Sequence, residues 1–157
     1  MESCRPRMIR SSFHIGHAPH VAYVYIWLSV RESVVYVGQT NDASGVIGRA
    51  AQHVSRGGSL RKCLWDKGYE LDEIDDFLLL SYPLPRGWRY TDTESSGREA
   101  VEYYVQVGIR YLQDELQEYL RIVSHVRSTD YLDQGEAKRL AQEIVADFKE
   151  VYDCAVL

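Results

Sequence analysis

The sequence has few cysteines and no long apolar run, and these two scarcities exclude several classes of protein. Its three cysteines, Cys4, Cys63 and Cys154, are far apart and form no C-x-x-C pair. This excludes a zinc ribbon or disulfide framework and predicts reduced thiols in a reducing, cytoplasmic compartment. The most apolar stretch, Val21 to Val30, has the length of a strand, so no membrane association is expected. The N-terminus also lacks the continuous apolar region of a secretory signal.

An excess of basic residues is also lacking, because the formal net charge is -5 and the pI is near 5.5. A protein that coats nucleic acid without specificity is therefore not expected. The charge is uneven along the chain. Residues 1–110 carry 13 acidic and 13 basic residues, whereas residues 111–157 carry 10 acidic and 5 basic ones. The first two thirds can thus hold a local basic face, which leaves nucleic acid open as a partner.

Length and patterning predict one domain with two appended segments. The 157 residues, 45% of them hydrophobic, suffice for one substantial core. Residues 1–20 have no hydrophobic period and contain three arginines, so we expect a flexible basic arm. Residues 21–110 form the domain proper. Residues 111–157 are an acidic helical extension expected to pack on the same domain.

Runs of β-branched and aromatic residues predict a small sheet. Val21–Leu28 and Ser33–Val37 are joined by a turn too short for a parallel crossover, so they predict an antiparallel pair. Gly38 is expected to break the second strand and to let the backbone approach a ligand. Asp76–Tyr82 predicts a third, buried strand. The expected fold class is α+β, with a three-stranded antiparallel sheet flanked by helices.

Helical periodicity predicts the remaining elements. A helix over Val46–Ser55 has an expected inner stripe formed by Val46, Ile47, Ala50, Ala51 and Val54, flanked by Arg49 and His53. A short helix over residues 60–68 follows, with Ser59 as its cap. A long helix runs from Arg98 to about Arg127, and a last helix begins at Ser128–Asp130. These two helices predict a C-terminal helical hairpin that offers a surface for a homodimer or larger complex.

Four polar side chains are expected to converge beside the strand pair. Tyr25 and Tyr36 lie in the two predicted strands, and Arg49 and His53 share one face of the following helix. Taken singly, each residue is more often structural. Two phenols, a guanidinium and an imidazole at one spot are instead unusual for a core, and together they predict an active site.

This ordered set resembles the GIY-YIG nuclease superfamily over about residues 21–110. The first signature reads Tyr23-Val24-Tyr25, without the family's glycine, and the second reads Tyr36-Val37-Gly38-Gln39-Thr40. An arginine followed four residues later by a histidine also fits. The family's metal-binding glutamate lies on the helix after the third strand. Glu102, followed by Tyr103-Tyr104-Val105, matches that position best, and Glu99 on the same helix face is the alternative.

The resemblance implies a hydrolase, a metal-dependent endonuclease that binds and cuts DNA in restriction, phage defence, repair or a mobile element. It implies that Tyr25 activates or positions water, that Tyr36 supports the site and that Arg49 binds the phosphate. His53 relays a proton or orients Tyr25. Glu102 holds Mg²⁺ or Mn²⁺ as the cofactor.

Further residues are expected to contact the DNA substrate. They are Gly38, Gln39 and Thr40 of the second signature, Arg61 and Lys62 at the start of the short helix, and Arg86 and Arg89 in a loop of cations and aromatics. The family's later asparagine is missing, or is replaced by a residue such as Gln113.

Two other interpretations stay open. A catalytically inactive or partner-dependent GIY-YIG-like subunit, serving in nucleic-acid binding or as a scaffold, is favoured by the missing glycine, the missing asparagine and the acidic pI. An unrelated α+β interaction domain with accidental motifs predicts instead that the four polar side chains do not converge.

Overall fold

The centre of the fold is a four-stranded sheet with the strand order β3-β1-β2-β4. This computed structural model describes residues 21–91, 96–116, 118–125 and 134–156. β1 (Tyr23–Ser29) pairs antiparallel with β2 (Val34–Thr40) and with β3 (Leu78–Pro83). The predicted α+β class and the antiparallel pairing of the first two strands are confirmed.

The prediction of three strands, all antiparallel, is wrong. β4 (Arg121–Ile122) pairs with β2 in parallel and makes the sheet mixed. It has only two residues, so it is too short to produce a period of two in the sequence. β2 also continues through Gly38 to Thr40, because Gly38 pairs with Tyr25 on β1 and does not break the strand.

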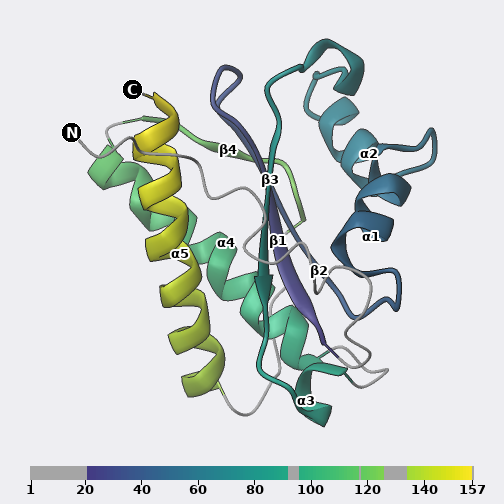
Figure 1. Cartoon of the computed structure of the whole chain (residues 1–157). Helices are drawn as coiled ribbons and strands as arrows, with labels where there is room; N and C mark the ends of the chain where they lie inside the picture. The colour runs from purple at the N-terminus through teal and green to yellow at the C-terminus, as the bar shows by residue number, and fades with distance from the viewer. Residues whose placement is uncertain (1–20, 92–95, 117, 126–133, 157) are drawn as a thin grey trace.

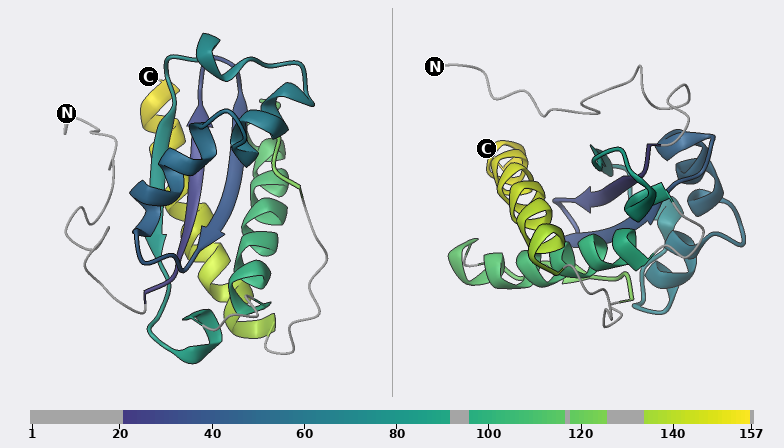
Figure 2. Two further views of the ribbon diagram at one scale, coloured as in Figure 1. Left: turned by 90° about the vertical axis from the view of Figure 1, so that its right-hand side faces the viewer. Right: turned by 90° about the horizontal axis from the view of Figure 1, so that it is seen from below.

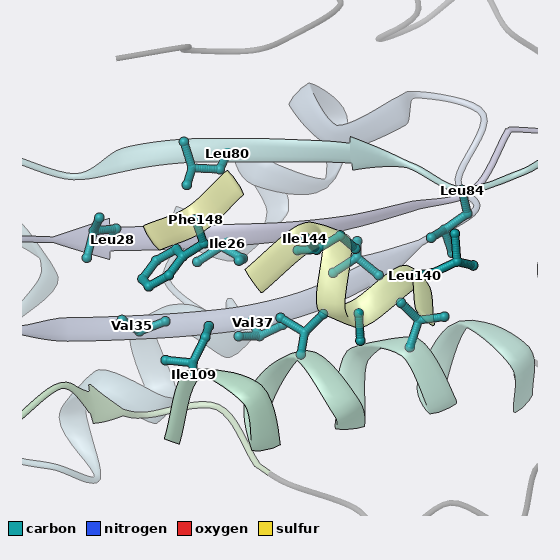
Figure 3. Packing of buried hydrophobic residues seen from close by; sticks show 14 of the residues in the cluster. Ile26, Leu28, Val35, Val37, Leu80, Leu84, Ile109, Leu140, Ile144 and Phe148 are labelled. Carbon is teal, nitrogen blue, oxygen red and sulfur yellow. The ribbon is translucent and has the colours of Figure 1, made fainter. Parts of the chain in front are cut away.

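Helices cover both faces of the sheet (Figures 1 and 2). Successive side chains of a strand point to opposite faces. One face, which includes Val24, Ile26 and Val37, packs against the helices α4 and α5, and Figure 3 shows this core. The opposite face, which includes Tyr25 and Tyr36, packs against α1 and α2. The helical elements are α1 (Gly45–Val54), α2 (Ser59–Trp65), the 3₁₀ turn η1 (Leu71–Glu73), α3 (Trp88–Thr91), α4 (Ser96–Leu116) and α5 (Gln134–Val156).

The two long helices run side by side in the same direction, so the predicted antiparallel hairpin is wrong. Lys138 near the start of α5 lies over the ring of Tyr104, while Tyr152 near its end bonds Glu118 just after α4. The long helix ends at Leu116 and not near Arg127. The chain then returns through β4, which is why α5 runs parallel to α4. The predicted start of the last helix, Ser128–Asp130, lies outside the described residues.

The inner face of α1 also differs from the expected stripe. Gly45, Val46, Ala50 and His53 are its buried residues. Ile47 and Val54 are exposed to 48% and 37%. Burial of the imidazole is possible because two hydroxyl groups from other elements bond both of its nitrogens.

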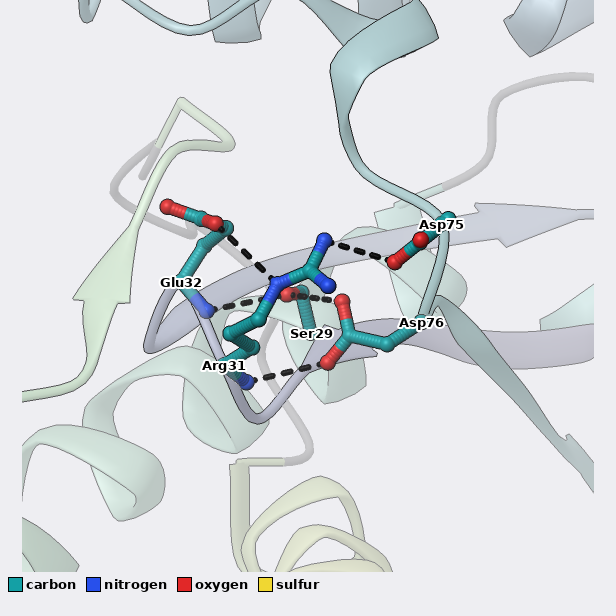
Figure 4. A network of polar contacts seen from close by, with 5 residues as sticks. All are labelled: Ser29, Arg31, Glu32, Asp75 and Asp76. Atoms are coloured by element: carbon teal, nitrogen blue, oxygen red, sulfur yellow. Dashed lines mark hydrogen bonds and ion pairs between the residues drawn. The ribbon is translucent and has the colours of Figure 1, made fainter.

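The turn between β1 and β2 is fixed by the segment that precedes β3 (Figure 4). Asp76 accepts a hydrogen bond from Ser29 Oγ at 2.6 Å and another from the backbone N–H of Arg31 at 2.9 Å. The Arg31 guanidinium also forms an ion pair with Asp75 at 2.6 Å. The acidic segment before β3 therefore anchors the hairpin through Asp76.

Two further observations bear on the sequence-based expectations. Cys63 is a free, buried thiol, as the sequence predicted for it. Of the helices in the described parts of the chain, none combines the length and the apolar character needed to cross a membrane.

Candidate active site

A cavity of about 280 Å³ lies beside β2, between α1 and α2 on one side and α4 on the other. β4 pairs with Val34 and Val35, and within the described parts of the chain no strand covers the rest of this edge of β2. This gap allows side chains of α4 to approach those of α1. The cavity is lined by Tyr36, Gln39, Arg49, Ser59, Glu99 and Glu102, among others.

A chain of hydrogen bonds joins the two signature tyrosines through His53. The Tyr25 hydroxyl bonds His53 Nε2, and His53 Nδ1 bonds Ser59 Oγ at 2.6 Å. The Tyr36 hydroxyl donates to Ser59 Oγ over a longer 3.4 Å. Both tyrosine rings also lie against the imidazole, with centroid distances of 5.4 and 5.3 Å. The predicted convergence is therefore present, with Ser59 as an added member.

The strand register explains why both tyrosines reach one imidazole. Tyr36 lies opposite Trp27, and Gly38 lies opposite Tyr25, so all four residues point to the α1 face of the sheet. The Tyr25 ring lies across Gly38, because a Cβ atom at residue 38 would be 2.5 Å from Tyr25 Cζ. Gly38 thus makes room for the Tyr25 ring, and the predicted close approach is to a side chain of the protein itself.

The four side chains of this hydrogen-bonded series differ in their access to the cavity. Tyr36 and Ser59 line it, whereas Tyr25 and His53, each 2% exposed, lie one layer deeper. Burial, and after it the charges of Tyr36 and Glu102, raise the pKa of Tyr25, against the lowering effect of Arg49. Burial also raises the pKa of Tyr36. Burial and then the charge of Arg49 lower the pKa of His53 to about 4.

The low pKa of His53 predicts a loss of stability in mild acid. The unfolded chain binds this proton near pH 6.5 and the folded protein only near pH 4. Between these values the unfolded state binds more protons, so the free energy of unfolding falls as the pH falls, by up to about 3 kcal/mol. Urea unfolding from pH 7 to pH 4 should show this slope in the wild type and lose it in His53→Asn. The exposed His125→Asn is the matched control and should keep it; equal slopes in all three proteins would contradict a buried neutral imidazole.

Arg49 and Glu102 bring opposite charges to the cavity. Both are half-buried and line it, from α1 and α4 respectively. The carboxylate of Glu102 raises the pKa of both Tyr25 and Tyr36, which places it within electrostatic reach of both phenols. Glu99 lines the same cavity but is not among the groups that shift either tyrosine. This difference favours Glu102 over Glu99 as the carboxylate of the tyrosine cluster.

The donor set suits a cation held by few protein ligands. Among the described residues, no group of three or more His, Cys, Asp or Glu side chains is arranged to hold a metal ion. Mg²⁺ accepts one or two carboxylates and keeps water or substrate oxygens as its other ligands. Glu102, with Glu99 beside it in the cavity, fits this mode of binding and not an all-protein cage.

The residues expected to contact the substrate are only in part near this cavity. Gln39 lines it and accepts a hydrogen bond from Arg98 Nε at 2.8 Å. Thr40 is buried and accepts a bond from the backbone N–H of Asp42 at 3.0 Å, so it stabilises the turn into α1.

The predicted basic residues lie elsewhere. Arg61 and Lys62 line a second pocket on the other side of α2, and Arg61 forms an ion pair with Asp72 at 2.8 Å. Arg86 is exposed after β3 and is not among the residues that line the cavity. The side chain of Arg89 lies outside the described part of the structure.

Three residues of the site were missed from the sequence. Ser59 was interpreted as a helix cap, but it is the first residue of α2 and its hydroxyl bonds His53. Arg98 is 3% exposed and donates to the backbone oxygen of Tyr90 as well as to Gln39. Gln106, one turn after Glu102, lines the cavity and is 1% exposed; its Oε1 has no hydrogen-bond partner among the described residues. Helical spacing of four from Glu102 was the one available signal for Gln106.

The suggested substitute for the family asparagine is not in the site. Gln113 donates through Nε2 to the backbone oxygen of Leu120 at 2.6 Å and thereby stabilises the chain reversal after α4. Comparison with protein-family models, with curated proteins and with solved structures found no match, so the function is inferred from these residues alone.

Proposed function

We propose that the protein is a metal-dependent endonuclease of the GIY-YIG type that hydrolyses DNA phosphodiester bonds. The observation that carries this proposal is the meeting of Tyr25, Tyr36, Arg49, His53 and Glu102 at one place, although they come from two strands and two helices. An unrelated domain with accidental motifs gives no reason for them to meet.

Each side chain has a role that its surroundings support. Arg49 lies at the cavity wall, where its forked guanidinium binds a phosphate. Tyr36 presents its hydroxyl at the same wall and orients the attacking water. Tyr25 lies deeper and acts through His53 and Ser59, which hold the hydroxyl of Tyr36 in place.

Burial sets the protonation states of Tyr25 and His53 in the free protein at neutral pH. The raised pKa of Tyr25 and the lowered pKa of His53 keep the phenol protonated and the imidazole neutral. A neutral imidazole donates a hydrogen bond from one ring nitrogen and accepts one at the other. His53 therefore donates to one of the two hydroxyl groups, of Tyr25 and Ser59, and accepts from the other.

Glu102 would hold the magnesium or manganese ion. When bound, such an ion supplies positive charge for the phosphoryl oxygens and lowers the pKa of a coordinated water. Because Glu99 and Glu102 are the carboxylates that line the cavity, oxygens of the bound phosphate would complete the ligands of such an ion. The ion is therefore expected to bind more tightly when DNA is bound, and DNA more tightly when the ion is bound.

Cleavage of supercoiled plasmid and of labelled linear and branched oligonucleotides, with Mg²⁺ or with EDTA, tests the proposal. We expect cutting in Mg²⁺ only, and a loss of about 100-fold or more in Arg49→Ala, because one contact to the developing charge is removed. Arg139→Ala, on the exposed face of α5, is the control and should cut like the wild type.

Absence of cutting on every substrate would overturn the enzymatic proposal. DNA binding that persists in that case favours the inactive or partner-dependent subunit. The deep burial of Tyr25 and His53 is the observation that supports this second function, because neither group reaches the cavity directly.

A further inference from the structure

A second pocket, of about 270 Å³, lies on the face of α2 opposite the candidate active site. Ser59 and Cys63, four residues apart, face the active-site cavity, whereas Lys62 and Trp65 face this pocket. One short helix therefore separates the two hollows. Trp65 is 67% exposed, although tryptophan is a side chain that folded proteins usually cover.

The pocket combines an open aromatic ring with cations. Arg56, Arg61 and Lys62 line it together with Trp65 and Tyr69. Arg61 is paired with Asp72, but Arg56 and Lys62 have no ion-pair partner among the described residues. The Tyr69 ring is already covered by the guanidinium of Arg121, 5.6 Å from its centroid, so Trp65 is the ring left open for stacking.

The charge of this part of the chain suits a polyanion. From Gly45 to Trp65, which spans α1 and α2, there are four basic residues and no acidic one, although the whole chain carries -5. Asp66 and Glu70 also line the pocket. Their oxygens can accept hydrogen bonds from the amino group of a nucleobase, while they would repel a phosphate placed beside them.

We propose that this pocket binds an unpaired nucleobase of the DNA strand, stacked on Trp65, while Arg56 and Lys62 contact the adjoining phosphates. This inference rests on the proposed function and extends it. Only α2 separates the two hollows, and a helix is about 10–12 Å across with its side chains, so one DNA strand can reach both a base site on its outer face and Arg49 on its inner side. The pocket therefore gives the nuclease a preference for single-stranded, gapped or bulged DNA over a perfect duplex.

Fluorescence anisotropy with a short labelled polydeoxyadenylate strand, in EDTA so that no cutting occurs, tests the proposal. Trp65→Ala should weaken binding about tenfold, because the aromatic ring on which the base stacks is removed. Trp65→Phe keeps a stacking ring and should bind within about threefold of the wild type. Tyr111→Ala, an equally exposed aromatic (73%) in the groove between α4 and α5, is the matched control and should bind like the wild type. Thermal unfolding confirms that all variants are folded.

The outcomes separate this inference from the nuclease proposal. Equal binding by the wild type and Trp65→Ala, or equal losses in Trp65→Ala and Tyr111→Ala, would overturn the base-stacking pocket even if the wild type cuts DNA. A selective loss in Trp65→Ala, with a bulged duplex bound more tightly than a perfect one, would support the pocket even if no cutting is found. A wild type that binds no single strand would overturn it as well.

Discussion

Replacing Glu102 with glutamine is expected to lower Mg²⁺-dependent DNA cleavage by about 1000-fold, because a charged contact to the reacting centre is removed. Glutamine keeps the length and nearly the volume of the side chain but removes its charge. Glu102 is the carboxylate whose charge acts on both Tyr25 and Tyr36. Single-turnover cleavage of a labelled oligonucleotide, with Mg²⁺ well above saturation, measures the chemical step.

Glu99→Gln is the discriminating companion, because Glu99 lines the same cavity one turn earlier on α4. We expect a loss of no more than about tenfold there, since a water-mediated or peripheral contact is weaker than a direct ligand. Binding of Mn²⁺ followed by its paramagnetic resonance signal gives a readout without cleavage, and only Glu102→Gln should weaken it strongly. A larger loss in Glu99→Gln would move the ligand by one turn. Wild-type cleavage in both variants would contradict a cation site on α4.

The sequence pattern predicted those strands whose own residues form a recognisable apolar run. β1, β2 and β3 are runs of apolar residues. The hairpin of β1 and β2 follows from a connection too short for a parallel pairing. β4 has no such signal. Its pairing depends on the backbone bonds Arg121 N–H to Ser33 oxygen and Val123 N–H to Val35 oxygen, which link residues nearly ninety positions apart. No local preference of two residues can predict that contact.

The misplaced end of the long helix has a similar cause. Leu120 and Val123 continue the three- and four-residue spacing of the helix, and both are buried, each to 1% exposure. They lie after α4 has ended at Leu116, on either side of β4, and are buried there without being helical. Spacing records which residues are covered but not which backbone conformation covers them.

The site was predicted better as a set of residues than as an arrangement. Tyr25, Tyr36, Arg49, His53 and Glu102 come together, but their order from the cavity inward was not foreseen. The hydrophobic pattern predicts His53 at the flank of the apolar stripe of α1, because its imidazole is polar. Its partners, Tyr25 and Ser59, lie in other elements, and they make its burial favourable. Arg61 and Lys62 were likewise expected to contact the substrate because they are basic. They line the second pocket instead, on the opposite face of α2.

The second large effect, on stability and on cleavage, is expected from adding one methyl group to β2 at Gly38. Gly38→Ala would place a Cβ atom 2.5 Å from both Cζ and the hydroxyl oxygen of Tyr25. The Tyr25 ring cannot move aside easily, since it is 2% exposed and its hydroxyl is held by His53. We expect the variant to lose about 3 kcal/mol of unfolding free energy, the upper range for overpacking a core. Urea unfolding at pH 7 measures this loss.

The same substitution should also lower cleavage, and by more than the loss of stability explains. Gly57→Ala is the matched control, because nothing lies within 4 Å of a Cβ at residue 57. It should unfold and cut like the wild type. At a temperature where Gly38→Ala is fully folded, a cleavage rate reduced by about 100-fold or more would show that the position of the Tyr25 ring, through His53 and Ser59, sets the hydroxyl at the cavity wall. A folded Gly38→Ala protein that cuts at the wild-type rate would contradict any role for Tyr25 and the hydrogen-bonded chain behind Tyr36. The glycine of the second signature would then serve strand packing alone.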